Sequence, residues 1–173
     1  MKKVILLLAI TFGMNASAQM SARDSVTFLK GYNSVKGSHS VFDEQTRYTS
    51  PMFMNAFSSM SVPRLIKVVG DDGSVVTYLS LDANSVSLAI GEGLKVLLDD
   101  GSKMEFPDAA ADADVNSNGG YRYSCFVRLT DDQVETLANH RIKAWECYIF
   151  GNAMFPARQL KIMGVARKMT EIK

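Results

Sequence analysis

The chemistry of two cysteines depends on where this protein works. Cys125 and Cys147 each lie among apolar neighbours, in two segments that the sequence predicts as strands. In an oxidising compartment the pair would form a disulfide, and closing a loop of about 22 residues would contribute roughly 3 kcal/mol to stability. Two buried thiols that pack as small apolar groups are the alternative. Neither cysteine has a neighbouring basic cluster or helix start that would lower its pKa, which disfavours a catalytic cysteine.

Histidine is scarce, which limits catalytic hypotheses. The chain has two, His39 beside Ser38 and His140 just after a predicted helix. Adjacent residues on an extended chain point in opposite directions, so Ser38 and His39 form a poor nucleophile and base pair. The signatures of serine hydrolases, zinc peptidases, Cys-x-x-Cys proteins and phosphate-binding loops do not occur in the sequence. These observations disfavour catalysis. The rival hypothesis is a small exported hydrolase that uses Ser38 or an aspartate with either histidine.

Adjacent carboxylates and oxygen-rich loops are the next candidates for chemistry. Three Asp-Asp pairs each have a local explanation in a turn or in the first turn of a helix. Asp114, Asn116 and Asn118, followed by Gly119, resemble the start of an EF-hand calcium loop, but its twelfth position is Cys125 instead of a carboxylate. A long hairpin turn explains the same residues, and calcium binding by Asp114, Asn116 and Asn118 is the alternative.

One segment combines sulfur and aromatic side chains without a helical or strand period. It contains Met52, Phe53, Met54, Phe57 and Met60 among serines. Exposed apolar patches commonly mark partner surfaces, so this segment is a candidate partner surface; a loop that covers the core is the alternative. Thioethers also bind Cu(I), which makes Met52, Met54 and Met60 a second metal hypothesis.

The first 18 residues have the three parts of a secretory signal peptide. Lys2 and Lys3 precede an apolar run, and Ala16-Ser17-Ala18 forms a cleavage site. We expect a mature protein that begins near Gln19 and is periplasmic or secreted. The first cysteine is Cys125, so the sequence predicts no lipid anchor, and no later apolar run predicts insertion into a membrane.

The composition predicts one soluble β-rich domain over residues 19–173. Without Lys2 and Lys3, 17 of the 19 basic residues remain against 18 acidic ones, a net charge near −1 that gives no support for nucleic-acid binding. We expect residues 19–40 to form a loosely ordered lead-in with an edge strand at residues 26–29. No cofactor is predicted.

The candidate residues must be positioned mainly by hairpins. Residues 65–69 and 75–81, and again 94–98 and 103–106, flank an Asp-Asp-Gly-Ser turn, and residues 111–115 and 121–129 form a third hairpin. Alternation of Val86, Leu88 and Ile90 with small residues predicts a further strand.

The last third of the chain adds helical signals. Thr130, with Gln133 three residues later, predicts a capped helix over residues 131–139. A strand is predicted over residues 142–150. A helix between two strands allows one parallel crossover pair. After Pro156, apolar residues at helical spacing predict a C-terminal helix, with a strand at 160–163 as the alternative. The fold class is therefore mainly β (α+β): an antiparallel sheet or sandwich of about seven to nine strands, one short helix and a candidate C-terminal helix.

Several short strings resemble small uncharacterised exported proteins of Bacteroidetes-type bacteria. They are Tyr78-Leu-x-Leu81, Asp100-Gly-Ser-Lys103, Pro107, Tyr121-x-Tyr123-Ser124-x-Phe126, Leu129-Thr130 and Tyr148-Ile149-Phe150. The resemblance implies a β-rich exported domain and carries no activity. With the scarcity of catalytic groups, it leads us to expect a non-catalytic binding or interaction module whose partner is a protein or glycan of the cell envelope. A hydrolase and a metal-holding accessory protein remain the alternatives.

Overall fold

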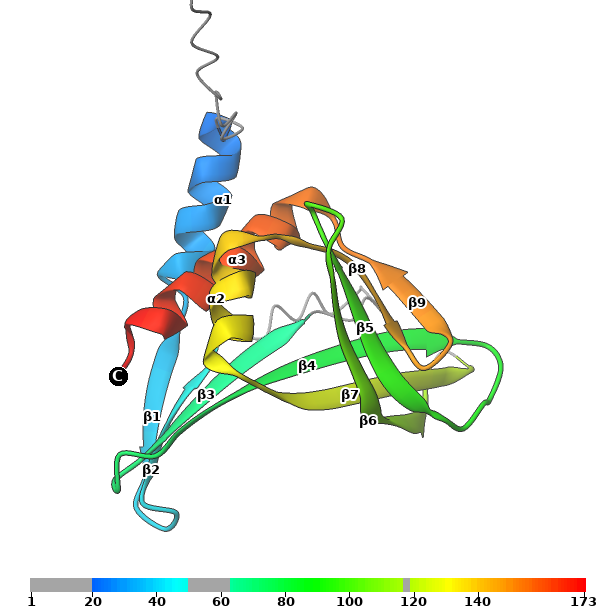
Figure 1. Cartoon of the computed structure of the whole chain (residues 1–173), viewed down its shortest axis with the longest axis horizontal. Helices are drawn as coiled ribbons and strands as arrows, with labels where there is room; N and C mark the ends of the chain where they lie inside the picture. Colours follow the sequence, from blue (N-terminus) through cyan, green and yellow to red (C-terminus); the bar gives the residue numbers. More distant parts are fainter. Residues whose placement is uncertain (1–19, 50–62, 117–118) are drawn as a thin grey trace, which may run out of the picture.

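In the part of the chain that the structure describes, one antiparallel sheet carries three helices (Figure 1). The computed structural model describes residues 20–49, 63–116 and 119–173. Within these residues the strand order is β1-β2-β3-β4-β7-β6-β5-β8-β9. This order confirms the mainly β fold class, and the sheet is open because its end strands, β1 and β9, do not pair with each other. The elements are α1 (Ala22–Tyr32), β1 (Lys36–Ser40), β2 (Gln45–Thr49), β3 (Arg64–Gly70), β4 (Val75–Ser85), β5 (Glu92–Leu98), β6 (Lys103–Val115), β7 (Tyr121–Leu129), α2 (Asp131–Asn139), β8 (Ile142–Cys147), β9 (Phe150–Ala153) and α3 (Pro156–Glu171).

The three predicted hairpins are present, and one long strand joins two of them. β3 pairs with β4, β5 with β6, and β6 with β7, all antiparallel. β6 pairs with β5 up to Ala110 and with β7 from Ala111 onward, and its register with β5 shifts near Pro107. Proline is tolerated in a sheet at such irregular positions because it has no N–H to donate. The change of partner along β6 turns the sheet back over itself.

The folded-back half of the sheet packs on β4. The indole nitrogen of Trp145 in β8 donates to the carbonyl of Asp82 in β4, at 2.8 Å. The fully buried side chains of Leu79, Leu81 and Tyr123 lie between the two halves. The core is therefore enclosed by one sheet on two sides, and α2 and α3 contribute Leu137 and further apolar residues to it.

α1 and α3 cross in very close contact. A Cβ atom at Gly164 would lie 2.6 Å from the carbonyl oxygen of Phe28, and one at Gly31 would collide with the backbone of Lys161. The hydroxyl of Tyr32 donates to Glu171 and strengthens this contact. Gly164, which costs helix propensity in isolation, is thus required by the packing of the two helices.

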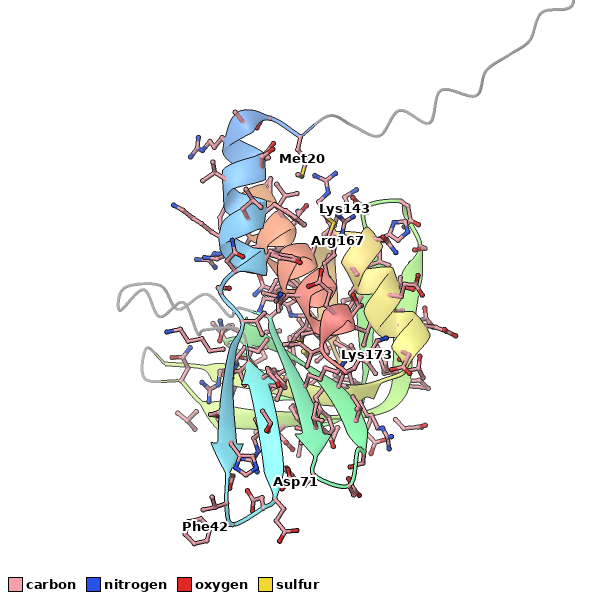
Figure 2. The ribbon with its side chains drawn as sticks, turned by 90° about the vertical axis from the view of Figure 1, so that its left-hand side faces the viewer. Met20, Phe42, Asp71, Lys143, Arg167 and Lys173 are labelled. Atoms are coloured by element: carbon pink, nitrogen blue, oxygen red, sulfur yellow. The ribbon has the colours of Figure 1, made fainter. Side chains whose placement is uncertain are left out.

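Two basic side chains bind the free carbonyl groups at helix ends. The ammonium group of Lys67 in β3 donates to Met169 (2.7 Å) and Ile172 at the end of α3. Arg167 of α3 donates to the carbonyl of Ala138 in the last turn of α2, at 2.8 Å, and lies between α3 and α2 in Figure 2. Cations are favourable at helix C-termini because the carbonyl groups there carry partial negative charge.

Several expectations about individual elements need correction. Residues 26–29 belong to α1, a helix capped by Ser21 that packs on α3, and form no edge strand; Val26 and Leu29 are about half exposed, and the expected loose lead-in contains α1 and β1. Val86, Leu88 and Ile90 lie in the loop between β4 and β5 and are exposed. The strand predicted over 142–150 turns at residues 148–149, and β8 pairs only with antiparallel neighbours.

Other predictions are confirmed. α2 has the capping box of Thr130 and Gln133, and residues 160–163 lie in helix α3 rather than in a strand. The predicted signal peptide and the segment over residues 50–62 lie outside the described residues. In the described part of the chain, each helix is too short or too polar to cross a membrane.

Candidate functional site

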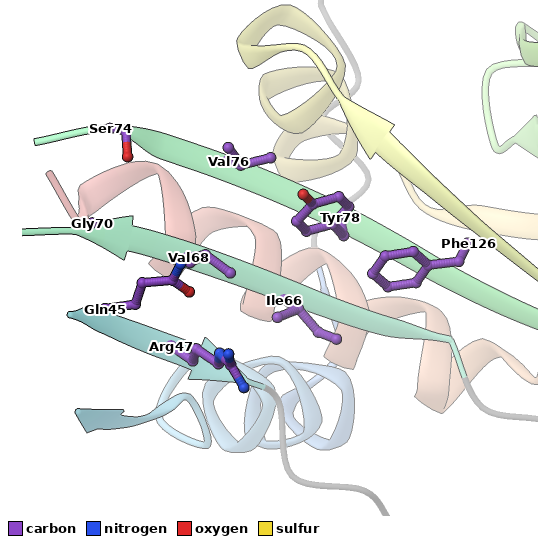
Figure 3. A pocket seen from close by; sticks show the side chains of 9 residues that line it. All are labelled: Gln45, Arg47, Ile66, Val68, Gly70, Ser74, Val76, Tyr78 and Phe126. Carbon is purple, nitrogen blue, oxygen red and sulfur yellow. The ribbon is translucent and has the colours of Figure 1, made fainter. Parts of the chain in front are cut away.

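The face of the sheet that turns away from the helices carries a groove of about 450 Å³ (Figure 3). β2, β3, β4 and β7 supply its lining, which consists of Gln45, Arg47, Ile66, Val68, Gly70, Ser74, Val76, Tyr78 and Phe126. This volume is within the range of small-molecule sites.

Strand alternation explains why these side chains face outward. Leu65 and Lys67 point to the inner side, where they are buried and Lys67 reaches α3. Ile66 and Val68, one position along, must point to the opposite face, and both are half-buried. The groove is therefore built on the same strands that form the core, which makes its floor rigid.

Cross-strand pairing places the lining residues in rows. Arg47 pairs with Val68, which in turn pairs with Val76. The next row begins with Ile66, which pairs with Tyr78. The groove thus has an aliphatic floor between a polar end on β2 and an aromatic end on β4 and β7.

The aromatic end consists of two stacked rings. Tyr78 and Phe126 have ring centroids 4.8 Å apart and planes inclined by 16°. Phe126 is 55% exposed, although a phenyl ring normally gains free energy by burial. Holding two aromatic rings in contact at the surface leaves apolar area available to a ligand.

The polar end contains hydrogen-bond donors. The guanidinium group of Arg47 forms an ion pair with Asp43 at 2.7 Å, and both side chains are about half exposed. This pair orients Arg47 on the outer face and leaves part of its five-donor fork for a ligand. Gly70 also lines this end of the groove, and a Cβ there would lie 2.5 Å from Asp72 and 2.6 Å from Ser74.

The structure brings the two cysteines together in the core. The thiol of Cys147 lies 3.5 Å from the carbonyl oxygen of Leu81, the strand partner of Cys125. Both residues are described as thiols and are buried. Their mutual hydrogen bond lowers the pKa of Cys125 and, with burial, raises the pKa of Cys147. The disulfide stays a prediction.

The two histidines of the hydrolase hypothesis contact different carboxylates, and neither histidine is among the residues that line the groove. His39 contacts Asp71 at 3.4 Å, and His140 contacts Asp99 and Asp100 at 3.5 Å. In the part of the chain that the structure describes, neither imidazole has a serine or cysteine as a hydrogen-bond partner. The hydrolase hypothesis gains no support from this arrangement.

The remaining predicted sites have mixed outcomes. Asp114 forms an ion pair with Arg122 at 3.3 Å, and Asn116 donates to Asn84, whereas Asn118 lies outside the described residues. Calcium binding stays a prediction. All five residues of the candidate partner surface, Met52, Phe53, Met54, Phe57 and Met60, also lie outside the described residues.

The sequence did not single out the groove, although part of its signal is present there. The outward positions of the predicted strand over 121–129 include Phe126 among polar residues, which is an exposed aromatic side chain on a solvent face. Its contact with Tyr78 depends on the pairing of β4 with β7, two strands that are not consecutive.

Comparison of the chain with protein-family models, curated proteins and solved structures found no match.

Proposed function

We propose that this protein is an exported, non-catalytic binding module that holds an uncharged saccharide of the cell envelope in the groove over β2, β3, β4 and β7. The observation that carries the proposal is the stacked pair of Tyr78 and Phe126 at the surface end of the groove. The apolar face of a sugar ring packs on an aromatic ring, and its hydroxyl groups need hydrogen-bonding partners at the edge.

The chemistry at the two ends of the groove suits such a ligand. Arg47 and Gln45 provide donors at one end, and the phenol of Tyr78 adds a polar group at the other. A near-neutral net charge after removal of the leader favours an uncharged ligand over a nucleic acid. The groove volume of about 450 Å³ limits the tightly held part to one or two sugar rings.

The test is ligand-observed saturation-transfer NMR of the purified protein with a panel of neutral monosaccharides and disaccharides. We expect at least one sugar to receive saturation, and Phe126→Ala to weaken its binding by about tenfold, which corresponds to ~1.4 kcal/mol. Phe42→Ala is the matched control, since Phe42 is 94% exposed at the β1–β2 turn (Figure 2) and is not among the residues that line the groove. Absence of binding to every sugar, or equal losses in the two variants, would contradict the proposal.

A protein partner is the second candidate, and the loop between β4 and β5 favours it. Val86 and Ile90 are 87% and 88% exposed, yet the loop is fixed because the buried hydroxyl of Tyr123 donates to Ser87 and accepts from Ala89. Ordered apolar side chains at the surface are typical of interaction sites. Affinity capture from the cell envelope should recover a specific protein with the parent chain and with Phe126→Ala, but not with Ile90→Asp.

A further inference from the structure

The two Asp-Asp-Gly-Ser turns have the same local structure. In the β3–β4 turn the amide of Ser74 donates to Asp72 (2.8 Å), and in the β5–β6 turn the amide of Ser102 donates to Asp100 (2.9 Å). A histidine from another segment approaches each turn: His39 from β1 in the first, and His140 from the end of α2 in the second.

The two turns differ in how many carboxylates the histidine reaches. In the first, the imidazole of His39 forms an ion pair with Asp71 and, among the described residues, with no second carboxylate. In the second, Nδ1 of His140 lies 3.5 Å from Oδ1 of Asp99 and 3.5 Å from Oδ2 of Asp100. Histidine nitrogen, cysteine sulfur and carboxylate oxygen atoms can bind a metal ion. In the described ranges of the chain, Asp99, Asp100 and His140 are the one group of three such residues whose ligand atoms all lie within 4.8 Å of one another.

Neighbouring groups fix the two carboxylates in this arrangement. Arg141 binds Asp99 through its backbone amide (3.1 Å) and its Nε atom (2.7 Å). Oδ1 of Asp100 accepts from the amide and the hydroxyl of Ser102, which leaves Oδ2 directed at His140. Such outer hydrogen bonds orient ligands in metal sites.

The charge of the cluster suits a cation. It combines two carboxylates with one guanidinium group, that of Arg141, which binds Asp99 at 2.7 Å. Side-chain exposures of 24% to 42% give an aqueous ion access.

We propose that Asp99, Asp100 and His140 form a Zn²⁺ site at the junction of the β5–β6 turn and the segment that joins α2 to β8. Zinc bound by oxygen and nitrogen at about 2.0–2.1 Å in tetrahedral geometry has its ligand atoms about 3.3 Å apart, close to the separations from His140. Three protein ligands leave a fourth position for water.

The first test is isothermal titration of the purified protein with ZnCl₂. We expect one site per chain, unchanged by His39→Ala and weakened at least tenfold by His140→Ala and by Asp100→Asn. Asparagine at residue 100 retains an oxygen for the turn, so folding should be preserved, and a melting curve without zinc checks this for each variant. His39 is the matched control because it also lies beside an Asp-Asp-Gly-Ser turn.

Proton NMR gives a second readout that does not depend on any variant. The chain has two histidines, so the imidazole region shows two sets of signals, and zinc should shift only the set that disappears in His140→Ala. A shift of the His39 signals, binding that is equal in the parent and His140→Ala, or no binding at millimolar zinc would overturn the proposal.

Discussion

Lys67 illustrates how one residue can serve two elements. Its side chain is 8% exposed, lies between β3 and α3, and donates to carbonyl groups at the end of α3. Burial lowers the pKa of its ammonium group, yet the charge remains useful because those carbonyls carry the negative end of the helix dipole. The inner face of β3 is otherwise apolar, and Lys67 is accommodated there because it binds the carbonyl groups at the end of α3.

Replacing this lysine should measure the value of the helix cap. In Lys67→Met the apolar stem is retained and both hydrogen bonds are lost, so we expect the free energy of unfolding to fall by about 1–3 kcal/mol. Urea denaturation provides the measurement. Lys95→Met is the control, since Lys95 is exposed and its nearest carboxylate oxygen, in Glu146, is 3.9 Å away; a change of less than about 0.5 kcal/mol is expected there. Equal effects in the two variants would contradict a capping role.

Sequence reasoning at the residue scale recognised local chemistry and missed long-range contacts. The capping box of Thr130 and Gln133 was predictable because both partners lie within one turn. The stacking of Tyr78 on Phe126 and the approach of His140 to Asp99 depend on which strands become neighbours. No spacing along the chain contains that information.

Between elements, the crossing of α1 and α3 is the contact that tolerates least change. Gly31 and Gly164 let the two backbones touch, and the ring of Phe28 lies beneath the guanidinium group of Arg167, 5.3 Å from the ring centroid. The cation and the aromatic face attract each other. α1 is therefore held by shape and by electrostatics together.

Gly164→Ala tests the shape requirement. Alanine favours a helix by about 1 kcal/mol over glycine, but its methyl group would collide with the backbone of α1, so we expect a net loss of about 1–3 kcal/mol. Urea denaturation gives the free energy, and amide hydrogen exchange should show faster exchange in α1. Gly151→Ala is the control, because its added Cβ would lie 3.6 Å from the nearest neighbouring atom. A more stable Gly164→Ala protein would refute the close contact.

The elements that were predicted correctly have signals within a few residues. The hairpins follow from Asp-Gly turns whose glycines have positive φ, 81° at Gly73 and 88° at Gly101. α1 also has a local signal, since Ser21 accepts from the amide of Asp24 as an N-cap, but the need for Gly31 in this helix is explained only by its contact with α3. The alternation of Val86 and Ile90 suggested a strand, yet these side chains face solvent in a loop.

For the whole molecule, the folding back of the sheet brings its two halves into contact at the cysteines. Cys125 lies on β7 and Cys147 on β8, strands that are not neighbours in the sheet. A covalent bond between them would join the halves across the core. A disulfide here would therefore contribute to the stability of the entire fold.

If the protein is exported as proposed, the isolated protein should contain the Cys125–Cys147 disulfide. Its intact mass should be lower by two hydrogen atoms than that of the reduced protein, and reduction should lower the free energy of unfolding by roughly 3 kcal/mol. Cys125→Ser should remove the response to the reductant. Alkylation of both cysteines in denaturant without a reductant would refute the bridge.

The pairing of α1 with α3 also has a consequence for the order of folding. The two helices come from opposite ends of the described chain, so the surface that receives α1 is absent until α3 has formed. Contacts of such large sequence separation tend to form late, because the intervening chain must first lose its conformational freedom. We therefore expect α1 to dock late in folding, and a chain that stops before α3 would leave α1 without a binding surface.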